Sequence, residues 1–176
     1  MSIQKYNIMG YQTVFDGEFK LNKPLKKKQI EYLKKFAETR RMKRNSIETE
    51  KLPDPVRKAV KLPIGVEGGY FVGDTEDFGQ GRTPDIIDYN SPPNGQPGLW
   101  NQWVPNEDGT AITWDGGEKF YSYVEWLRYI IGHFLAPWGY VLNGEVTWSG
   151  EEQGDVGIII CKNNKVAVKH GKIVYE

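Results

Sequence analysis

Residues 112–148 decide the fold, and they read ITWDGGEKFYSYVEWLRYIIGHFLAPWGYVLNGEVTW. Asp115 is a favourable helix N-cap, and Glu118 stands three residues later, as in a capping box. Apolar residues then recur at helical spacing until Pro137 and Gly139 end the pattern. The stretch therefore predicts a strand, a capped amphipathic helix and a second strand. The helical stripe comprises Phe120, Tyr123, Val124, Leu127, Ile130, Ile131 and Phe134.

Further strands are predicted on both sides of this helix from alternating apolar and polar residues. Upstream, the Pro105–Gly109 turn predicts a hairpin. Downstream, Asn163-Asn164 predicts a tight turn, because asparagine tolerates the left-handed conformation. The predicted strands cover residues 10–21, 99–104, 110–114, 140–149, 156–161, 165–169 and 173–175. In the first of them, Gly17 is expected to form a bulge.

A second helix is predicted at about residues 25–43. Apolar residues recur there at helical spacing, and Pro24 suits a helix start because no needed hydrogen bond is lost. The cations of residues 40–44 would then lie where the helix dipole favours them. The stripe comprises Ile30, Leu33, Phe36 and Ala37.

Residues 45–98 are rich in proline and glycine and predict an ordered insertion that packs on the main body. A short helix at 56–61 and a short strand within 65–73 are expected inside it. Hairpins outnumber crossovers along the chain, so we predict one α+β domain over residues 1–176 with a mainly antiparallel sheet and two principal helices. The first part fits a ferredoxin-like, split βαβ arrangement with extra C-terminal strands.

The composition narrows the class of protein. The chain has 176 residues and one cysteine, Cys161, so neither an intramolecular disulfide nor a cysteine metal site is expected. A signal peptide and a membrane-spanning run are not recognised, which favours a cytoplasmic protein without a membrane partner. Net charge is zero, yet residues 23–61 carry 14 Lys and Arg against 5 Asp and Glu.

Several segments resemble a family of small uncharacterised proteins of bacteria, actinomycetes especially, and of phages. The similarity covers about residues 14–168 and is carried by residues 36–42, 95–100, 114–121 and 139–151. The resemblance implies no activity or catalytic residue. By association, it favours a phage-related or host-interaction accessory protein.

The sequence offers little for catalysis. His133, His170 and Cys161 show neither metal-ligand nor triad spacing, and the glycines match no phosphate-binding motif. We therefore expect no catalytic residue, metal or cofactor. An enzyme working through Asp115, Glu118 or the carboxylates of residues 145–155 stays open as an alternative; for Asp115 and Glu118 the structural reading is helix capping. An acidic group comprises Glu145, Glu151, Glu152 and Asp155. This group could form a cation site, and the alternative is a solvated loop.

Two binding surfaces remain. The basic helix, residues 25–44, could contact the phosphates of a nucleic acid or a nucleotide, although overall charge is neutral and no nucleic-acid motif is recognised. Its cations are Lys26, Lys27, Lys28, Lys34, Lys35, Arg40, Arg41, Lys43 and Arg44.

The preferred hypothesis is a non-catalytic binding protein acting on a protein or small ligand. The chain has more large aromatic residues than one core is expected to hold, and exposed aromatics beside arginine are typical interface anchors. Trp126 lies off the main helical stripe, which favours exposure. The candidate binding residues are Arg40, Arg41, Tyr89, Trp100, Trp103 and Trp126.

Overall fold

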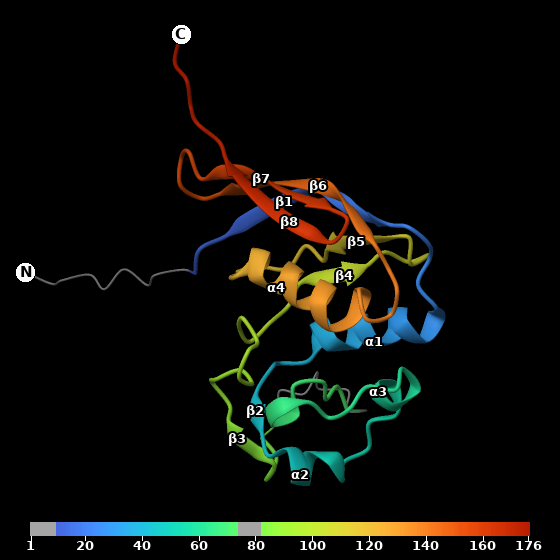
Figure 1. The fold of residues 1–176 in the computed structure, drawn as a ribbon. Coiled ribbons are helices and arrows are strands. Elements are labelled where there is room, and N and C mark those ends of the chain that lie inside the picture. The colour runs from blue at the N-terminus through green and yellow to red at the C-terminus, as the bar shows by residue number, and fades with distance from the viewer. Residues whose placement is uncertain (1–9, 74–81) are drawn as a thin grey trace, which may run out of the picture.

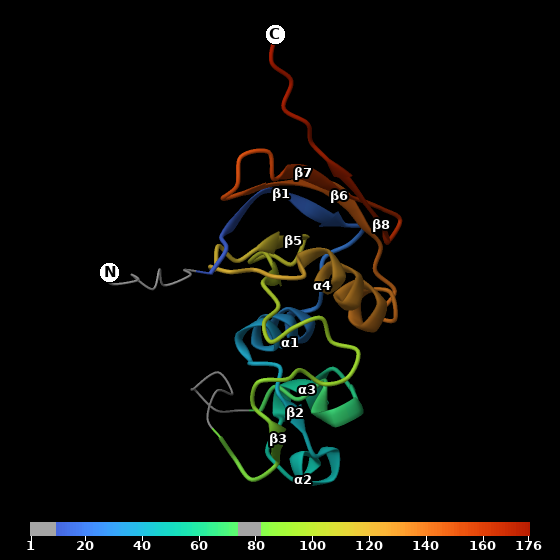
Figure 2. The same cartoon turned by 90° about the vertical axis from the view of Figure 1, so that its left-hand side faces the viewer.

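Three layers make up the computed structural model, which describes residues 10–73 and 82–176 (Figures 1 and 2). A six-stranded antiparallel sheet forms one outer layer. Helices α1 (Lys27–Glu38) and α4 (Tyr123–Ile130) cover one face of it. A lobe of residues 41–73 and 82–98 lies on the far side of these helices. The predicted α+β class is confirmed.

The sheet has the strand order β4-β5-β1-β6-β7-β8. Its strands are β1 (Thr13–Leu21), β4 (Trp103–Pro105), β5 (Ala111–Trp114), β6 (Leu142–Gly150), β7 (Val156–Lys162) and β8 (Lys165–His170). The chain passes through β1, α1, β4, β5, α4 and β6 in turn, and β1 lies between β5 and β6, antiparallel to both. This succession is compatible with the split βαβ arrangement expected from the sequence.

Strand β1 shows why this sheet buries one face. Phe15 and Phe19 are buried against the helices, while Asp16 and Glu18 alternate toward solvent. The expected bulge at Gly17 is wrong, because the β1–β6 register runs unbroken from Thr13 to Leu21. Gly17 instead has φ 107°, and a Cβ there would lie 2.6 Å from the Glu145 carbonyl oxygen. Only glycine fits such a close strand approach.

Helix α1 ends at Glu38, five residues before the predicted end. Residues 40–44 are not helical and run along the lobe: Arg41 N–H donates to the Leu99 carbonyl (2.8 Å) and Lys43 N–H to that of Ser91 (2.8 Å). Strand β2 (Lys43–Arg44) then pairs with β3 (Ile86–Asp88). The prediction that these cations stabilise a helix end is therefore wrong.

Helix α4 begins at Tyr123, well after the predicted cap at Asp115. Asp115 Oδ1 accepts a hydrogen bond from Gly117 N–H (2.7 Å), which makes a turn rather than a capping box. Gly116, Lys119 and Ser122 all have positive φ, so the chain from 115 to 122 cannot be helical. After Ile130 the helix continues as a π-helical turn, Ile131–Leu135.

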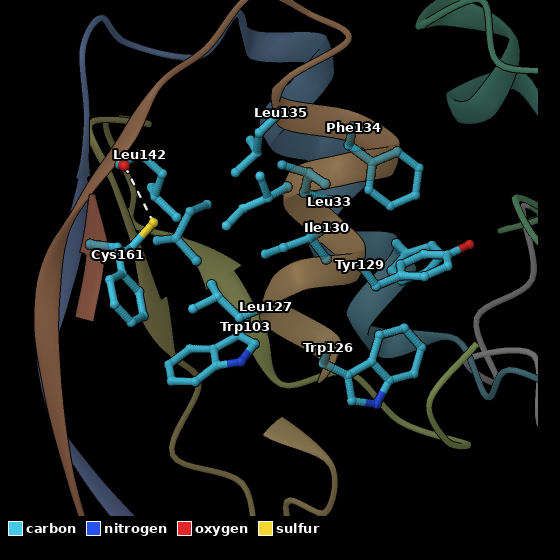
Figure 3. Close-up of a cluster of buried hydrophobic side chains, with 14 of the residues drawn as sticks. Leu33, Trp103, Trp126, Leu127, Tyr129, Ile130, Phe134, Leu135, Leu142 and Cys161 are labelled. Carbon is cyan, nitrogen blue, oxygen red and sulfur yellow. Dashed lines mark hydrogen bonds between the residues drawn. The ribbon is translucent and has the colours of Figure 1, made fainter. Parts of the chain in front are cut away.

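Both sides of α4 are buried. Leu127 and Ile130 face the sheet together with Trp103, whereas Trp126 and Tyr129 project on the other side of the helix (Figure 3). The expectation that Trp126 is exposed is wrong, since α1 and the lobe cover this second side.

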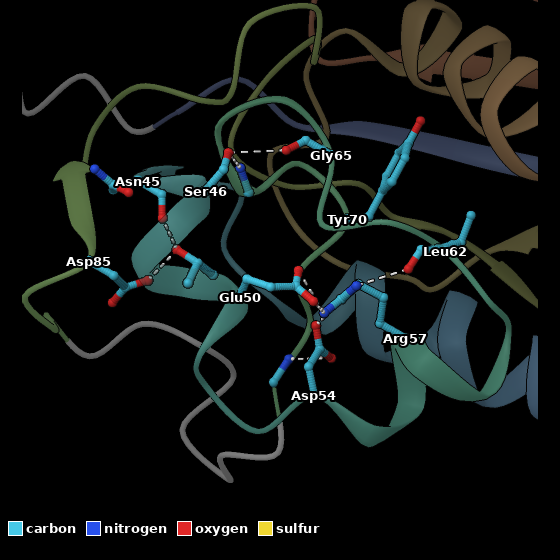
Figure 4. Close-up of polar contacts among 12 residues, drawn as sticks. Asn45, Ser46, Glu50, Asp54, Arg57, Leu62, Gly65, Tyr70 and Asp85 are labelled. Carbon is cyan, nitrogen blue, oxygen red and sulfur yellow. Dashed lines mark hydrogen bonds and ion pairs between the residues drawn. The ribbon is translucent and has the colours of Figure 1, made fainter.

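The described part of the lobe contains α2 (Ser46–Glu50) and α3 (Pro55–Ala59). The strand expected within 65–73 is wrong: Val66–Gly68 forms a 3₁₀ turn, and residues 74–81 lie outside the described residues. Arg57 holds the lobe through Nε to Asp54 Oδ2 (2.5 Å) and Nη1 to the Leu62 carbonyl (2.9 Å), as Figure 4 shows. The strand predicted at 173–175 is also wrong, since residues 171–176 are irregular.

Candidate ligand-binding site

Small-molecule sites are usually concave, mainly apolar cavities of roughly 300–1,000 Å³. One mainly apolar cavity of this protein lies between residues 97–102 and 118–122. We call it the Trp100 pocket, and its volume is about 430 Å³. Its apolar lining includes Leu99, Trp100 and Tyr121. The full lining is Pro97, Gly98, Leu99, Trp100, Gln102, Glu118, Lys119, Tyr121 and Ser122.

The first wall is the segment that leads from the lobe into β4. Its Leu99 carbonyl accepts from Arg41 N–H (2.8 Å), which ties it to the chain after α1. The Asn101 side chain accepts from Trp103 N–H (3.1 Å) and donates to the Trp103 carbonyl (2.9 Å). These bonds place Trp100 at the surface and Trp103 in the core.

The second wall is the irregular segment before α4, and Gln102 joins it to the first. Gln102 Nε2 donates to the Glu118 carbonyl (2.7 Å), and Gln102 Oε1 accepts from Trp114 Nε1 (3.0 Å). Both ends of this amide are therefore engaged. Hydrogen bonds fix the two walls before any ligand binds, so the pocket is preformed.

Three predicted binding residues meet beside this pocket. The Arg40 guanidinium lies 4.3 Å from the centre of the Tyr89 ring and 6.0 Å from that of Trp100. Arg40 Nε donates to the Tyr89 carbonyl and Nη2 to Asn90 Oδ1, both at 3.1 Å. We call Arg40, Tyr89 and Trp100 the aromatic–arginine cluster; Trp100 belongs to both the cluster and the pocket.

The other three predicted binding residues are buried, so a partner cannot reach them at the surface. Arg41, Trp103 and Trp126 are 2%, 1% and 0% exposed. Trp103 packs edge-on against Phe15 and donates from Nε1 to the Tyr123 carbonyl (2.7 Å). Their assignment as surface contacts is therefore corrected. Sequence reasoning missed this because it assumed one core, and the second buried side of α4 depends on the lobe.

Arg41 is an unusual core residue. Its guanidinium stacks on Phe36 at 4.2 Å, and Nη2 donates to the carbonyls of Gly69 (3.0 Å) and Phe71 (2.8 Å). Burial lowers the pKa of Arg41 to about 10, so the side chain still carries its charge at neutral pH. Burying a charge in this way is costly unless it is well paired.

Unpartnered polar groups gather on this same side of α4. Within the described residues, four buried side-chain atoms lack a hydrogen-bond partner: Arg41 Nε and Nη1, Gln96 Oε1 and Trp126 Nε1. Arg41 and Gln96 share the Gly69 carbonyl, to which Gln96 Nε2 donates at 2.6 Å. Gln96 Nε2 also donates to the Tyr129 hydroxyl (2.9 Å), and the Tyr129 ring lies 5.4 Å from that of Trp126. One buried interface therefore contains all four atoms.

Three of the candidate carboxylates, Asp115, Glu151 and Asp155, make structural contacts. Asp115 is engaged in its turn, where burial raises the pKa of its carboxyl. In the acidic group, Asp155 accepts from Tyr11 Oη (2.5 Å) and Trp148 Nε1 (3.0 Å), and these hydrogen bonds lower its pKa. Glu151 Oε1 accepts a hydrogen bond from the backbone N–H of Gln12 (2.7 Å). Over residues 10–73 and 82–176, His, Cys, Asp and Glu side chains form no group suited to a metal ion.

Nucleophilic chemistry finds equally little support. Cys161 is buried beside Leu142, to whose carbonyl its thiol donates (3.3 Å), and burial raises the pKa of Cys161 to about 11. His133 stacks on Tyr129 at 4.0 Å and contacts the Tyr70 hydroxyl through Nδ1 (2.6 Å).

A second cavity of about 370 Å³ shares Ser122 with the Trp100 pocket. Its lining includes the charged or titratable side chains Glu125, Arg128 and His170.

The predicted basic surface is interrupted. Arg41 is buried, and Arg44 is buried in an ion pair with Asp85 (2.7 Å). Exposed cations remain on α1, including Lys27 and Lys28. The continuous basic face expected of residues 25–44 is therefore absent from the described chain.

No family model, no curated protein and no solved structure matches this chain. Among the described residues, none of the helices combines the length and apolar character needed to cross a bilayer.

Proposed function

We propose that this protein is a non-catalytic binding protein whose Trp100 pocket holds the apolar part of a small organic ligand. One observation carries the proposal: a mainly apolar cavity of about 430 Å³ lies between two walls that hydrogen bonds already fix in place. Binding sites for small molecules are usually preformed, concave and apolar, with few polar groups.

The hydrogen bonds around the pocket support binding rather than chemistry. Both ends of the Gln102 side-chain amide form hydrogen bonds that hold the two walls together. Both ends of the Asn101 side-chain amide form hydrogen bonds within the turn into β4. Side chains held in this way give shape to a cavity and are poorly placed to transfer protons or attack a substrate.

A titration with ethylbenzene, followed by two-dimensional ¹H–¹⁵N NMR, tests the proposal. We expect saturable shifts at the amides of residues 97–102 and 118–122. Leu99→Trp should fill the cavity and abolish them, whereas Val14→Trp, on the open face of the sheet where Val14 is 53% exposed, should not. Shifts that are absent, lie elsewhere or survive Leu99→Trp would overturn the proposal.

The aromatic–arginine cluster supports a second candidate, a protein partner. Aromatic rings beside arginine are typical anchors of protein interfaces, and the cluster borders the pocket. A phage-related or host-interaction accessory role would use this surface. Arg40→Ala should then weaken capture of such a partner, and unchanged capture would contradict this candidate. Nucleic-acid binding is less favoured because two of its expected arginines are buried.

A further inference from the structure

The open face of the six-stranded sheet, which the helices do not cover, carries most of its charges in two separate groups (Figure 1). Exposed side chains alternate with buried ones along the strands that form it. The acidic half lies on β1 and β6 and consists of Asp16, Glu18 and Glu145. The basic half lies on β7 and β8 and consists of Lys162, Lys165 and Lys169. Lys20 also lies on this face, near the end of β1.

Like charges stand directly opposite each other within each half. The strand register pairs Glu18 with Glu145 and Lys162 with Lys165. Like charges in opposite positions of neighbouring strands destabilise a sheet. Over residues 10–73 and 82–176, the ion pairs of the protein involve none of these four side chains. Each half therefore carries a repulsion that opposite charges on a partner would relieve.

An apolar strip separates the two halves. Ile160 on β7 lies opposite Glu145 on β6 and opposite Ala167 on β8. Ile158 follows on the same face of β7, and both isoleucines are partly exposed. An apolar centre with charges around it is the usual composition of a protein interface.

Residues 171–176 add exposed apolar side chains on the same side of the sheet. In Figures 1 and 2 this segment leaves β8 and runs away from the helices. Ile173, Val174 and Tyr175 are 45%, 80% and 80% exposed. Gln153 Nε2 donates to Tyr175 Oη (3.3 Å), which holds the segment beside the loop between β6 and β7.

We propose that a second copy of this chain covers the open face, in a symmetric dimer whose two sheets stack face to face. A two-fold axis that lies between the sheets and passes beside Ile160 places the acidic half of each copy over the basic half of the other. Stacked sheets lie about 10 Å apart, a separation that a lysine and a glutamate side chain can span together.

The distribution of charge favours a second copy over another partner. A partner with charges of one sign would meet like charges on one half of the face. A copy of the chain supplies both signs, separated by the same apolar strip, and such complementarity fixes how two surfaces align. This surface lies on the other side of the sheet from the helices and is independent of the Trp100 pocket.

The size of the face predicts a weak dimer. About seven residues along each of four strands present a flat area of about 20 Å by 24 Å. This area is smaller than the roughly 800 Å² per partner of a standard interface, so we expect a Kd on the order of 10–100 µM.

Sedimentation velocity of the unaltered chain tests the dimer without any substitution. Between about 5 and 500 µM the protein should pass from monomer to dimer. Raising the salt from about 50 mM to about 500 mM should weaken the dimer at least fivefold, because salt screens the charges that align the two faces. A monomer throughout this range, or a dimer that salt does not weaken, would overturn the proposal.

Two charge reversals test which surfaces meet. The first variant carries Glu18→Lys and Glu145→Lys, and the second carries Lys162→Glu and Lys165→Glu. Each keeps a like-charged pair of a kind that this sheet already contains, so both should fold, as circular dichroism will show. Each variant alone should dimerise at least about tenfold more weakly, because both of its halves then carry the same sign. An equimolar mixture should form a heterodimer, because the charges are then complementary again.

A third variant controls for net charge. Glu31→Lys with Glu38→Lys changes the net charge as much as the first variant does, but at exposed positions on α1. It should dimerise like the unaltered chain. Dimers that survive either reversal on the sheet, a mixture that stays monomeric, or an equal loss in the α1 variant would each overturn the proposal.

Discussion

The two buried sides of α4 differ in chemistry. On the sheet side, Leu127 and Ile130 pack with Trp103, whose one polar atom is hydrogen-bonded. On the other side, Trp126 and Tyr129 meet α1 and the lobe. This interface buries Arg41 and Gln96 and contains the four buried side-chain polar atoms that lack a partner within the described residues.

The difference separates scaffold from site. An apolar layer is stabilised by burial alone and needs no further partner. A layer with unused donors is less stable than an apolar one would be, and such departures from good packing are expected at functional sites. The Trp100 pocket borders this second layer, since Gly98 lines the pocket and faces Trp126.

The largest expected effect comes from breaking the apolar side. Leu127→Ala should lower the free energy of unfolding by about 3 kcal/mol. Leu127 is fully buried, and its truncation would leave a cavity that the surrounding side chains fill only in part. Urea unfolding measures the change. Ile87→Ala, at a side chain 61% exposed, should cost under about 0.5 kcal/mol. A loss below about 1 kcal/mol for Leu127→Ala would contradict this assignment of the core.

The lobe should open first in acid. Burial of Asp85 opposes ionisation, but hydrogen bonds from Thr83 and Thr49 and the ion pair with Arg44 outweigh it and lower the Asp85 pKa. A carboxyl whose folded pKa is depressed stabilises the fold above its unfolded pKa, about 4, and this contribution is lost as pH falls below that.

Amide hydrogen exchange between pH 5 and 2.5, corrected for intrinsic rates, measures this opening. Protection should fall in residues 43–73 before it falls in β6 and β7. Asp85→Asn should cost about 2 kcal/mol at pH 7, because Arg44 keeps its buried charge without a counter-charge, and it should flatten the acid response. Simultaneous loss of protection in lobe and sheet would contradict the prediction.

Local signals predicted much of the sheet correctly. Alternation located β1, β6, β7 and β8 to within a few residues, and Asn163 and Asn164 have the positive φ expected of their turn. These features depend on neighbours in sequence. The β4–β5 hairpin was predictable for the same reason.

The predictions that were wrong failed because the structure there depends on contacts between residues far apart in the sequence. The spacing of Asp115 and Glu118 fits a helix cap, but Gln102 binds the Glu118 carbonyl, and Lys119 and Ser122 adopt left-handed conformations. Three of the six predicted binding residues lie together in the aromatic–arginine cluster, although Tyr89 and Trp100 are far from Arg40 in the sequence. The close approach of Trp126 to Gly98 could not be predicted, since it depends on where α4 places Trp126.

Arg41→Met sharpens the contrast between the two sides of α4. The change removes a buried charge with two unused donors and keeps an apolar side chain on Phe36. It also leaves the Phe71 carbonyl without its donor, so gain and loss should nearly cancel, within about 1 kcal/mol. Urea unfolding beside Leu127→Ala measures it. A loss above about 3 kcal/mol would show that the charge is well compensated.

The smallest effect is expected at His133, where the π-helical turn meets the lobe. Burial lowers the pKa of His133, and its Nδ1 faces the Tyr70 hydroxyl, whose own pKa burial raises. The neutral ring is therefore favoured in the folded state. As pH falls below about 6.5, the unfolded chain takes up the proton first, so stability declines. Solvent exposure at this site limits the decline to less than that caused by Asp85.

Thermal unfolding at pH 7.5 and pH 5.5 measures the His133 effect. Replacing His133 with Gln keeps a hydrogen-bonding group opposite Tyr70 and removes the titration, so the variant should lose less stability between these two pH values than the unaltered protein. Because Asp85 titrates lower, the two contributions fall in different pH windows. An unchanged difference in Tm between variant and unaltered protein at both pH values would mean that His133 does not couple the helix to the lobe.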